Sequence, residues 1–187
     1  MAIFDYLGID SATLVGLSHG AYVATAFAAE HPEKVNKLII CNLRAGRYGD
    51  AETFGRWHRK LTGEGLEAFA MDVIATATGQ TFQTQHAKLI QMMARAVAAR
   101  NSVAALAKQM EAMRTYPPAS EPAARVKAPA LVLTGGEDRV VPAGDAFILA
   151  DRMRARLLRI PHAGHSLPIE APEAFNAAIL TFLRPST

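Results

Sequence analysis

The sequence has 187 residues, of which 50% are hydrophobic and 20% charged, a composition typical of a globular protein rather than a disordered or fibrous one. The net charge of +3 comes from 20 basic and 17 acidic side chains that are interspersed along the chain, so we expect no nucleic-acid partner. No apolar run reaches the about 18 residues of a membrane helix, and the start lacks a signal peptide, so we expect no membrane partner and a cytoplasmic location. The single cysteine, Cys41, lies in an apolar run and is predicted to be a buried, reduced thiol, which favours a reducing compartment.

Four short apolar runs with β-branched residues predict strands at residues 13–17, 38–41, 130–134 and 156–160. The fourth prediction is the weakest, because that run carries arginines. Helical patterns follow three of the strands, at residues 21–30, 142–154 and 172–183. Strands that alternate with helices predict a mostly parallel sheet with helices on both faces, which is an α/β fold.

The middle of the chain, residues 44–126, contains no convincing strand. Helical patterns rich in Ala, Met, Leu and Gln occur at residues 64–78, 83–100 and 103–114. Such a block is too long for an ordinary connection, so it predicts a helical cap inserted between the second and third strands. We therefore divide the chain into a first part of the core, 1–43, a helical cap, 44–126, and a second part of the core, 127–187.

The segment Gly16-Leu17-Ser18-His19-Gly20 fits the G-x-S-x-G nucleophile elbow. In that motif the serine sits on a strained turn, so the residues two before and two after it must be small for the turn to close. The serine would lie at a helix N-terminus, where the backbone N–H of His19 can stabilise the oxyanion of a tetrahedral intermediate. The other interpretation is a strand-to-helix turn with a serine N-cap. The flanking strand and small-residue helix favour Ser18 as a nucleophile.

A nucleophilic serine needs a base, and the base needs a carboxylate to orient it. Asp138 follows the predicted strand 130–134, at the carboxyl edge where ligands bind in open parallel sheets. Glu137 is the competing acid, but as the neighbour of Asp138 it should point elsewhere. The other interpretation of Asp138 is a turn or helix-cap aspartate.

His165 lies in the loop after the last predicted strand and is the candidate general base. His19 is expected to face the pocket, because it follows the serine. The other four histidines are set aside by their positions: His31, His58, His86 and His162. No cluster has metal-ligand spacing and no phosphate loop or dinucleotide fingerprint occurs, so we expect no metal and no cofactor.

Four segments together resemble the C-terminal part of the α/β-hydrolase superfamily: residues 14–20, 31–35, 129–142 and 164–175. Within it, the chain is most similar to 3-oxoadipate enol-lactonases, through residues 41–49 followed by 52–57. The resemblance implies a serine hydrolase that cleaves a small-molecule carboxylic ester or lactone through an acyl-enzyme. It also implies that Arg47 and Trp57 hold the carboxylate and carbon skeleton of the substrate, as a guanidinium suits a carboxylate. Their alternative roles are ordinary cap surface and cap core.

Members of this superfamily carry further strands and an oxyanion loop before the elbow, whereas residues 1–12 here suffice for one short helix. We therefore expect a truncated α/β-hydrolase fold that lacks the second oxyanion donor, a loss that typically lowers rates about 10²- to 10³-fold. The strand 13–17 would become a bare apolar edge, which predicts a homo-oligomer or completion by a partner. The alternative function is an inactive fragment or interaction module that retains the triad.

Overall fold

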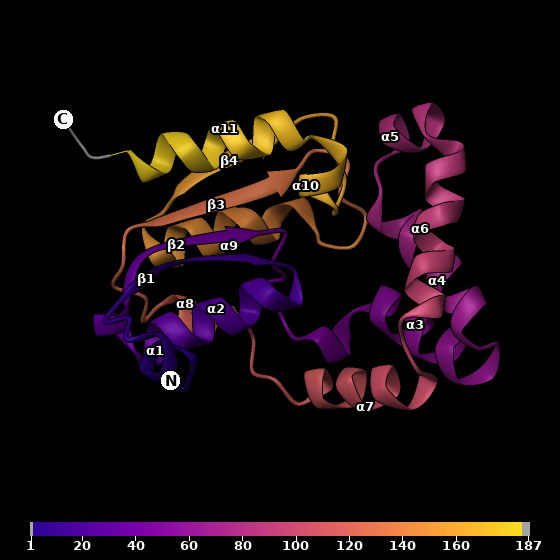
Figure 1. Ribbon diagram of the computed structural model, residues 1–187, viewed down its shortest axis with the longest axis horizontal. Helices are drawn as coiled ribbons and strands as arrows, with labels where there is room; N and C mark the ends of the chain where they lie inside the picture. Colours follow the sequence, from indigo (N-terminus) through magenta and orange to yellow (C-terminus); the bar gives the residue numbers. More distant parts are fainter. Residues whose placement is uncertain (1, 185–187) are drawn as a thin grey trace.

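The computed structural model describes residues 2–184, and among them it has one four-stranded parallel sheet. The strands follow the order of the chain: β1 (Ala12–Leu17), β2 (Val35–Cys41), β3 (Ala130–Gly135) and β4 (Arg156–Ile160). The predicted α/β class and the four predicted strands are confirmed, with extra residues at the ends of the first three. Because all four strands run the same way, their carboxyl ends meet at one rim of the sheet (Figure 1).

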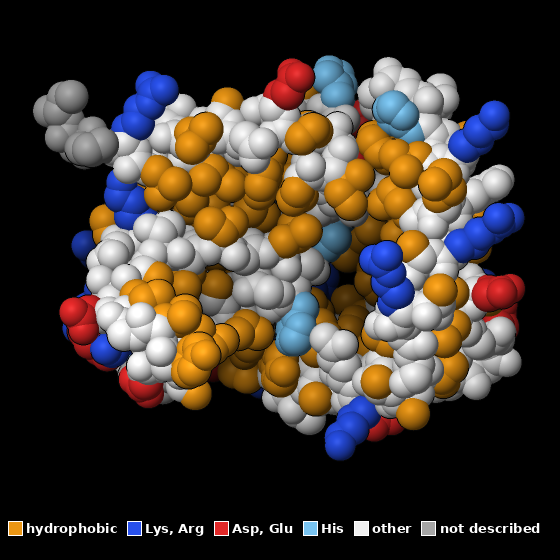
Figure 2. All heavy atoms as spheres, viewed as in Figure 1, with side chains coloured by type: hydrophobic (Ala, Val, Ile, Leu, Met, Phe, Trp, Pro, Cys, Tyr) orange, Lys and Arg blue, Asp and Glu red, His pale blue; other side chains and the backbone are white. Residues whose placement is uncertain are grey.

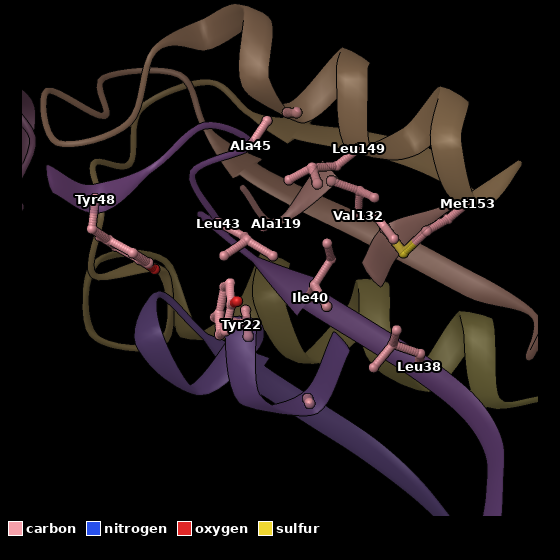
Figure 3. Packing of buried hydrophobic residues seen from close by; sticks show 14 of the residues in the cluster. Tyr22, Leu38, Ile40, Leu43, Ala45, Tyr48, Ala119, Val132, Leu149 and Met153 are labelled. Carbon is pink, nitrogen blue, oxygen red and sulfur yellow. The ribbon is translucent and has the colours of Figure 1, made fainter. Parts of the chain in front are cut away.

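Helices cover both faces of this sheet (Figure 1). The alternation of β2 side chains sends Leu38 and Ile40 to one face and Ile39 and Cys41 to the other. The first face packs against α2 (His19–Glu30), α8 (Ser120–Ala123) and α9 (Ala143–Met153), as Figure 3 shows for part of the cluster. The second face packs against α11 (Pro172–Leu183) through Phe175 and Ile179. Shorter helices are α1 (Ala2–Leu7), the 3-10 turn η1 (Pro32–Lys34) and α10 (Leu167–Glu170).

Among the described residues, all regular elements between β2 and β3 are helices. They include η2 (Tyr48–Asp50), α3 (Glu52–Gly63), α4 (Leu66–Ala77), α5 (Gln80–Gln85), α6 (Ala87–Ala99) and α7 (Val103–Arg114). Helices α3 to α6 stand beside the rim where the strands end (Figure 1). The domain boundaries given above stay predictions. Among the described helices, none combines the length and apolarity needed to span a bilayer.

One predicted helix is divided in the structure. The pattern at residues 83–100 predicts a single helix, whereas α5 ends at Gln85 and α6 begins at Ala87. His86 between them has φ −131° and ψ 37°, outside the helical region, and its ring packs 4.5 Å from that of Phe82. The sequence carries neither proline nor glycine at this point, so no local signal marks the break.

The two edges of the sheet differ in character. Among the described residues β1 has β2 as its only strand neighbour, and Val15 and Leu17 are 51% and 37% exposed. Their register with Ile39 and Cys41 puts both on the face of α11, where apolar side chains gather on the surface (Figure 2). The opposite edge, β4, carries exposed arginines, which discourage strand pairing.

Candidate active site

Ser18 stands on the turn between β1 and α2 with φ 53° and ψ −120°. A positive φ is uncommon for a residue other than glycine and marks a strained turn. A Cβ atom at Gly16 would lie 2.5 Å from the Cα of Ala21, so this position has no room for a side chain. The same expectation for Gly20 is wrong among the described residues, because a Cβ there would meet no atom within 4 Å. The turn therefore depends on one of its two glycines.

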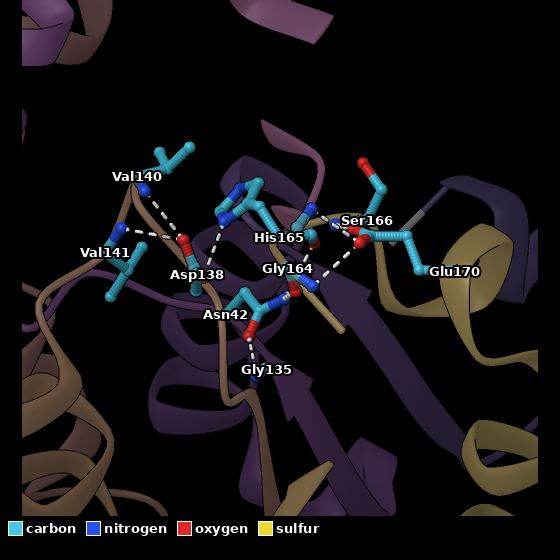
Figure 4. Close-up of polar contacts among 10 residues, drawn as sticks. Asn42, Gly135, Asp138, Val140, Val141, Gly164, His165, Ser166 and Glu170 are labelled. Atoms are coloured by element: carbon cyan, nitrogen blue, oxygen red, sulfur yellow. Dashed lines mark hydrogen bonds and ion pairs between the residues drawn. The ribbon is translucent and has the colours of Figure 1, made fainter. Parts of the chain in front are cut away.

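Asp138 and His165 are joined by a hydrogen bond at the rim of the sheet. The imidazole Nδ1 lies 2.9 Å from Asp138 Oδ2, and the two side chains are 9% and 3% exposed. The other carboxylate oxygen, Oδ1, accepts hydrogen bonds from the backbone N–H groups of Val140 (2.7 Å) and Val141 (3.0 Å) (Figure 4). Three donors therefore fix the orientation of this carboxylate, and Nε2 of His165 is left as the nitrogen available to a substrate or to a serine.

Glu137, the competing acid, turns away from His165. Its carboxylate accepts hydrogen bonds from the backbone N–H (2.8 Å) and the hydroxyl of Thr81 at the start of α5. These bonds, led by the one from the hydroxyl, lower the pKa of Glu137. The two neighbouring acids thus bind different partners: Asp138 binds the imidazole of His165, and Glu137 binds Thr81 of the helical segment.

Ser18 and His165 flank the carboxyl end of β2. The backbone N–H of Ser18 donates to the carbonyl of Cys41 at 2.9 Å, and the side chain of the next residue, Asn42, donates to the carbonyl of His165 at 2.7 Å. Among the described residues no hydrogen bond joins the Ser18 hydroxyl to His165. Catalytic hydrogen bonds are often long or poorly aligned in unliganded enzymes and shorten when the substrate binds.

A cavity of about 70 Å³ lies beside Ser18. Arg44 is the one ionised side chain in its lining, which otherwise consists of Ser18, Tyr48, Ala51, Thr53, Phe54, Trp57, Met113, Val140 and Val141. Larger hollows lie between α4 and α6 and at the far end of the sheet, and neither is lined by Ser18, Asp138 or His165. A more open hollow of about 290 Å³, lined by Asp138, shares Arg44, Val140 and Val141 with the cavity beside Ser18. The small cavity is therefore the candidate substrate site.

Two polar atoms in this lining have no protein partner. The hydroxyl of Tyr48 and the indole N–H of Trp57 are buried without a hydrogen bond among the described residues. Leaving such a group unpaired typically costs about 1–3 kcal/mol. Burial also raises the pKa of the Tyr48 hydroxyl, so that group stays protonated and can donate. Among the described residues, the wall of the cavity therefore contains two buried donors that no protein group satisfies.

Of the two residues predicted to hold a substrate, Trp57 lines the cavity and Arg47 does not. The side chain of Arg47 is exposed, and its carbonyl accepts a hydrogen bond from Nε of Arg44 at 2.9 Å. Sequence reasoning missed Arg44 and Tyr48. They belong to the same run of residues as Arg47, but only the path of the chain after β2 decides which of them faces Ser18.

His19 begins α2, so its backbone N–H has no acceptor inside the helix and is free to bind an oxyanion. Its ring stacks on Tyr116 at 5.9 Å, and its Nδ1 lies 3.2 Å from Nε2 of Gln109 on α7. Desolvation lowers the pKa of His19, which favours the neutral imidazole. No group of three or more His, Cys, Asp or Glu side chains within residues 2–184 is arranged to hold a metal ion.

Comparison with curated proteins finds relatives along nearly the whole chain. A 2-hydroxy-6-oxononadienedioate/2-hydroxy-6-oxononatrienedioate hydrolase of Burkholderia vietnamiensis is 31% identical over 191 residues, which cover 97% of this chain and 65% of that protein. A 3-oxoadipate enol-lactonase of Acinetobacter baylyi is 25% identical, over 96% of this chain and 66% of that protein. The chain thus spans about two thirds of the length of these relatives.

Solved structures agree with these relatives. The enol-lactonase from Burkholderia xenovorans superposes with a TM-score of 0.84 at 27% identity, over 97% of this chain and 68% of that one. An esterase from Thermogutta terrifontis gives the same TM-score at 26% identity and the same coverage. The family model described as "Alpha/beta hydrolase family" matches residues 2–178. The strand-turn-helix around Ser18, the hydrogen-bonded Asp138 and His165, and these matches together show that the chain belongs to the α/β-hydrolase family.

Proposed function

We propose that this protein is a serine hydrolase that cleaves a carboxylic ester or lactone through an acyl-enzyme, in the manner of 3-oxoadipate enol-lactonases. Ser18 is the nucleophile, His165 the general base, and Asp138 the carboxylate that orients the base. The observation that carries the proposal is the 2.9 Å contact between Asp138 and His165 at the rim where the strained turn presents Ser18. Hydrolases and lactonases among the relatives support the same reaction class.

In this mechanism His165 Nε2 takes the hydroxyl proton of Ser18 as the serine oxygen attacks the carbonyl carbon of the substrate. The carbonyl oxygen becomes an oxyanion that the backbone N–H of His19 and the N-terminus of α2 stabilise. When the tetrahedral intermediate collapses, the imidazolium returns the proton to the leaving alkoxide. Water then attacks the acyl-enzyme by the same proton path and releases the acid and free Ser18.

The substrate in this proposal carries a carboxylate besides its ester or lactone bond. Arg44 supplies the positive charge of the cavity, and a guanidinium suits a carboxylate. Arg44 therefore takes the role that the resemblance implied for Arg47. The relatives named for dioate and oxoadipate compounds are consistent with an acidic substrate.

A fluorophosphonate probe, which reacts with activated serines, tests the nucleophile. We expect the chain to be labelled, the Ser18→Ala variant not to be labelled, and His165→Ala to be labelled far more slowly. The control is Ser102→Ala, which changes an exposed serine that caps α7. It should be labelled at the same rate as the unchanged chain. Absence of labelling of the unchanged chain would favour the alternative, an inactive interaction module.

Paired ester substrates, with and without a terminal carboxylate, test the substrate class. We expect Arg44→Ala to lower kcat/KM for the carboxylate ester about 10- to 100-fold, the contribution of a hydrogen bond to a charged group. The neutral ester should be hydrolysed as before. Arg47→Ala is the matched control and should leave both esters unaffected. Equal losses for both esters with Arg44→Ala would contradict the assignment.

The proposal includes self-association through β1. This strand has an unpaired edge among the described residues, and its side chains Val15 and Leu17 are exposed. Strands of parallel sheets are normally covered on both faces. Sedimentation at working concentration should show a dimer or larger species that Val15→Lys dissociates. A compact monomer would end this part of the proposal. The setting proposed is the cytoplasm, where the buried thiol of Cys41, whose pKa burial raises to about 12, stays reduced.

A further inference from the structure

We infer that Asn42 and Glu170 are positioning residues that hold the backbone of residues 164–166 from two sides. They thereby keep the imidazole of His165 on Asp138 and directed towards Ser18. The inference rests on the proposed function in one respect only, namely that His165 acts as the base.

Asn42 follows β2 in the left-handed region, with φ 50°, and its side chain is buried at 2% exposure. Asparagine is enriched in this conformation relative to other residues with side chains, so the residue type suits the turn. Its amide Nδ2 donates to the carbonyls of His165 (2.7 Å) and Gly164 (3.3 Å). Its Oδ1 accepts from the N–H of Gly135 at the end of β3 (3.0 Å) (Figure 4). The one amide thus ties the histidine loop to the strand that leads to Asp138.

Glu170, at the end of α10, holds the same loop through its N–H groups. Its Oε2 accepts from Gly164 (2.8 Å), and its Oε1 accepts from Ser166 (2.9 Å) (Figure 4). Oε2 also accepts from the N–H of Gly79, which joins α4 to α5 (2.7 Å). Hydrogen bonds to a carboxylate are about twice as strong as neutral ones. Glu170 therefore connects the histidine loop to the helical segment as well as fixing its position.

The loop has little room to adjust between these two side chains. A Cβ at Gly164 would overlap the backbone of Thr78 and Gly79, and a Cβ at Gly135 would overlap the carbonyls of Ala163 and Gly164. The carbonyls of 164 and 165 and the N–H groups of 164 and 166 all have side-chain partners. The N–H of Ser166 also bonds to the carbonyl of Ala77 at 3.1 Å, so loss of Asn42 or Glu170 should shift the loop rather than release it. A displacement of about 1 Å can lower a catalytic rate about 10²-fold.

Two variants test this arrangement. Asn42→Gly retains the positive φ and removes the amide, and Glu170→Gln replaces one accepting oxygen by a donor. The matched controls are Asn36→Gly, which changes an exposed asparagine on the same strand, and Glu173→Gln, which changes an exposed acid at the start of α11. We expect the two test variants to react about 10- to 100-fold more slowly with the fluorophosphonate, and the controls to react at the unchanged rate.

Proton NMR tests the position of the imidazole directly, through the resonance of the proton that His165 shares with Asp138. The Nδ1 proton of His165, bonded to a carboxylate, should give a low-field resonance that disappears in His165→Gln. We expect this resonance to shift or broaden in Asn42→Gly and Glu170→Gln, at temperatures where circular dichroism shows both to be folded, and to stay in place in the controls.

The outcomes separate the inference from the function. If the unchanged chain does not react with the probe, the proposed function fails, and the NMR resonance still decides the positioning role. If the unchanged chain reacts and both test variants retain its rate and its resonance, the inference is overturned. Should Asn42→Gly fail to fold, Asn42→Asp replaces it, because aspartate can accept from Gly135 but cannot donate to the carbonyl of His165.

Discussion

The two halves of the candidate triad are held in different ways. Asp138 and His165 sit in loops that follow β3 and β4, and side chains and backbone groups from several segments bond to them. Ser18 sits on the turn after the edge strand β1, and within residues 2–184 its hydrogen bonds come from its backbone alone. The acid and base thus depend on a polar network, whereas the nucleophile depends on the shape of one turn.

The strands beneath the two halves differ in the same sense. All six residues of β3 are buried, whereas β1 has a single buried residue. Substitutions in the half that carries Asp138 and His165 should therefore lower both the catalytic rate and the free energy of unfolding. Substitutions in the half with the serine should matter where they disturb the turn.

The largest expected effect follows from Asp138→Asn. The carbonyl oxygen of the amide takes the place of Oδ1, which accepts from Val140 and Val141, so the NH2 group faces His165 and donates to Nδ1. The imidazole is then protonated at Nε2, which is the wrong tautomer for accepting a proton from Ser18. We expect kcat for an ester to fall about 10⁴-fold, the size of this effect in serine proteases. Asp151→Asn, an exposed acid on α9, is the control. A loss smaller than tenfold would contradict the role of Asp138.

A second test compares the strands. Leu133→Ala on β3 removes a fully buried side chain and should lower the free energy of unfolding by about 2–5 kcal/mol. Leu17→Ala on β1 removes a side chain that is 37% exposed, so the loss should be much smaller. Urea unfolding of both variants measures the difference. Equal losses at concentrations where sedimentation shows a monomer would contradict this comparison.

A third test concerns the turn itself. Gly16→Ala forces a Cβ against the backbone of Ala21 and should lower the free energy of unfolding by about 1–3 kcal/mol, with loss of fluorophosphonate labelling. Gly20→Ala, in the first turn of α2, meets no atom and should leave stability unchanged or raise it by up to about 1 kcal/mol. Thermal unfolding of the pair checks both values. Equal destabilisation by the two substitutions would contradict this difference between the glycines.

The smallest expected effect depends on pH. Because hydrogen bonds from Thr81 lower the folded-state pKa of Glu137, its ionised form is favoured by folding. This contribution is complete above the unfolded-state pKa and is lost as the pH falls through the lower folded-state pKa. Glu137→Gln should therefore reduce stability near neutral pH and flatten its loss in acid. Urea midpoints of both proteins from neutral to acidic pH measure this, and parallel curves would contradict it.

Much of the fold could be predicted from the sequence because its signals are local. The periodicity of apolar residues predicts helices at 103–114 and 172–183, the second beginning at Pro172. The structure has both helices at the same residues. The break at His86 could not be predicted in this way, because no residue there forbids a helix.

For the candidate site, the sequence by itself determined the four strands, the helices next to them and the three motifs that carry Ser18, Asp138 and His165, because spacing along the chain encodes each of them. The tertiary structure alone decided that Arg44 rather than Arg47 lines the cavity, and that Asn42 and Glu170 hold the histidine loop. Asn42 lies 123 positions from His165 in sequence and Glu170 lies 91 positions from Gly79, so whether these residues meet depends on how the strands and helices are arranged in space.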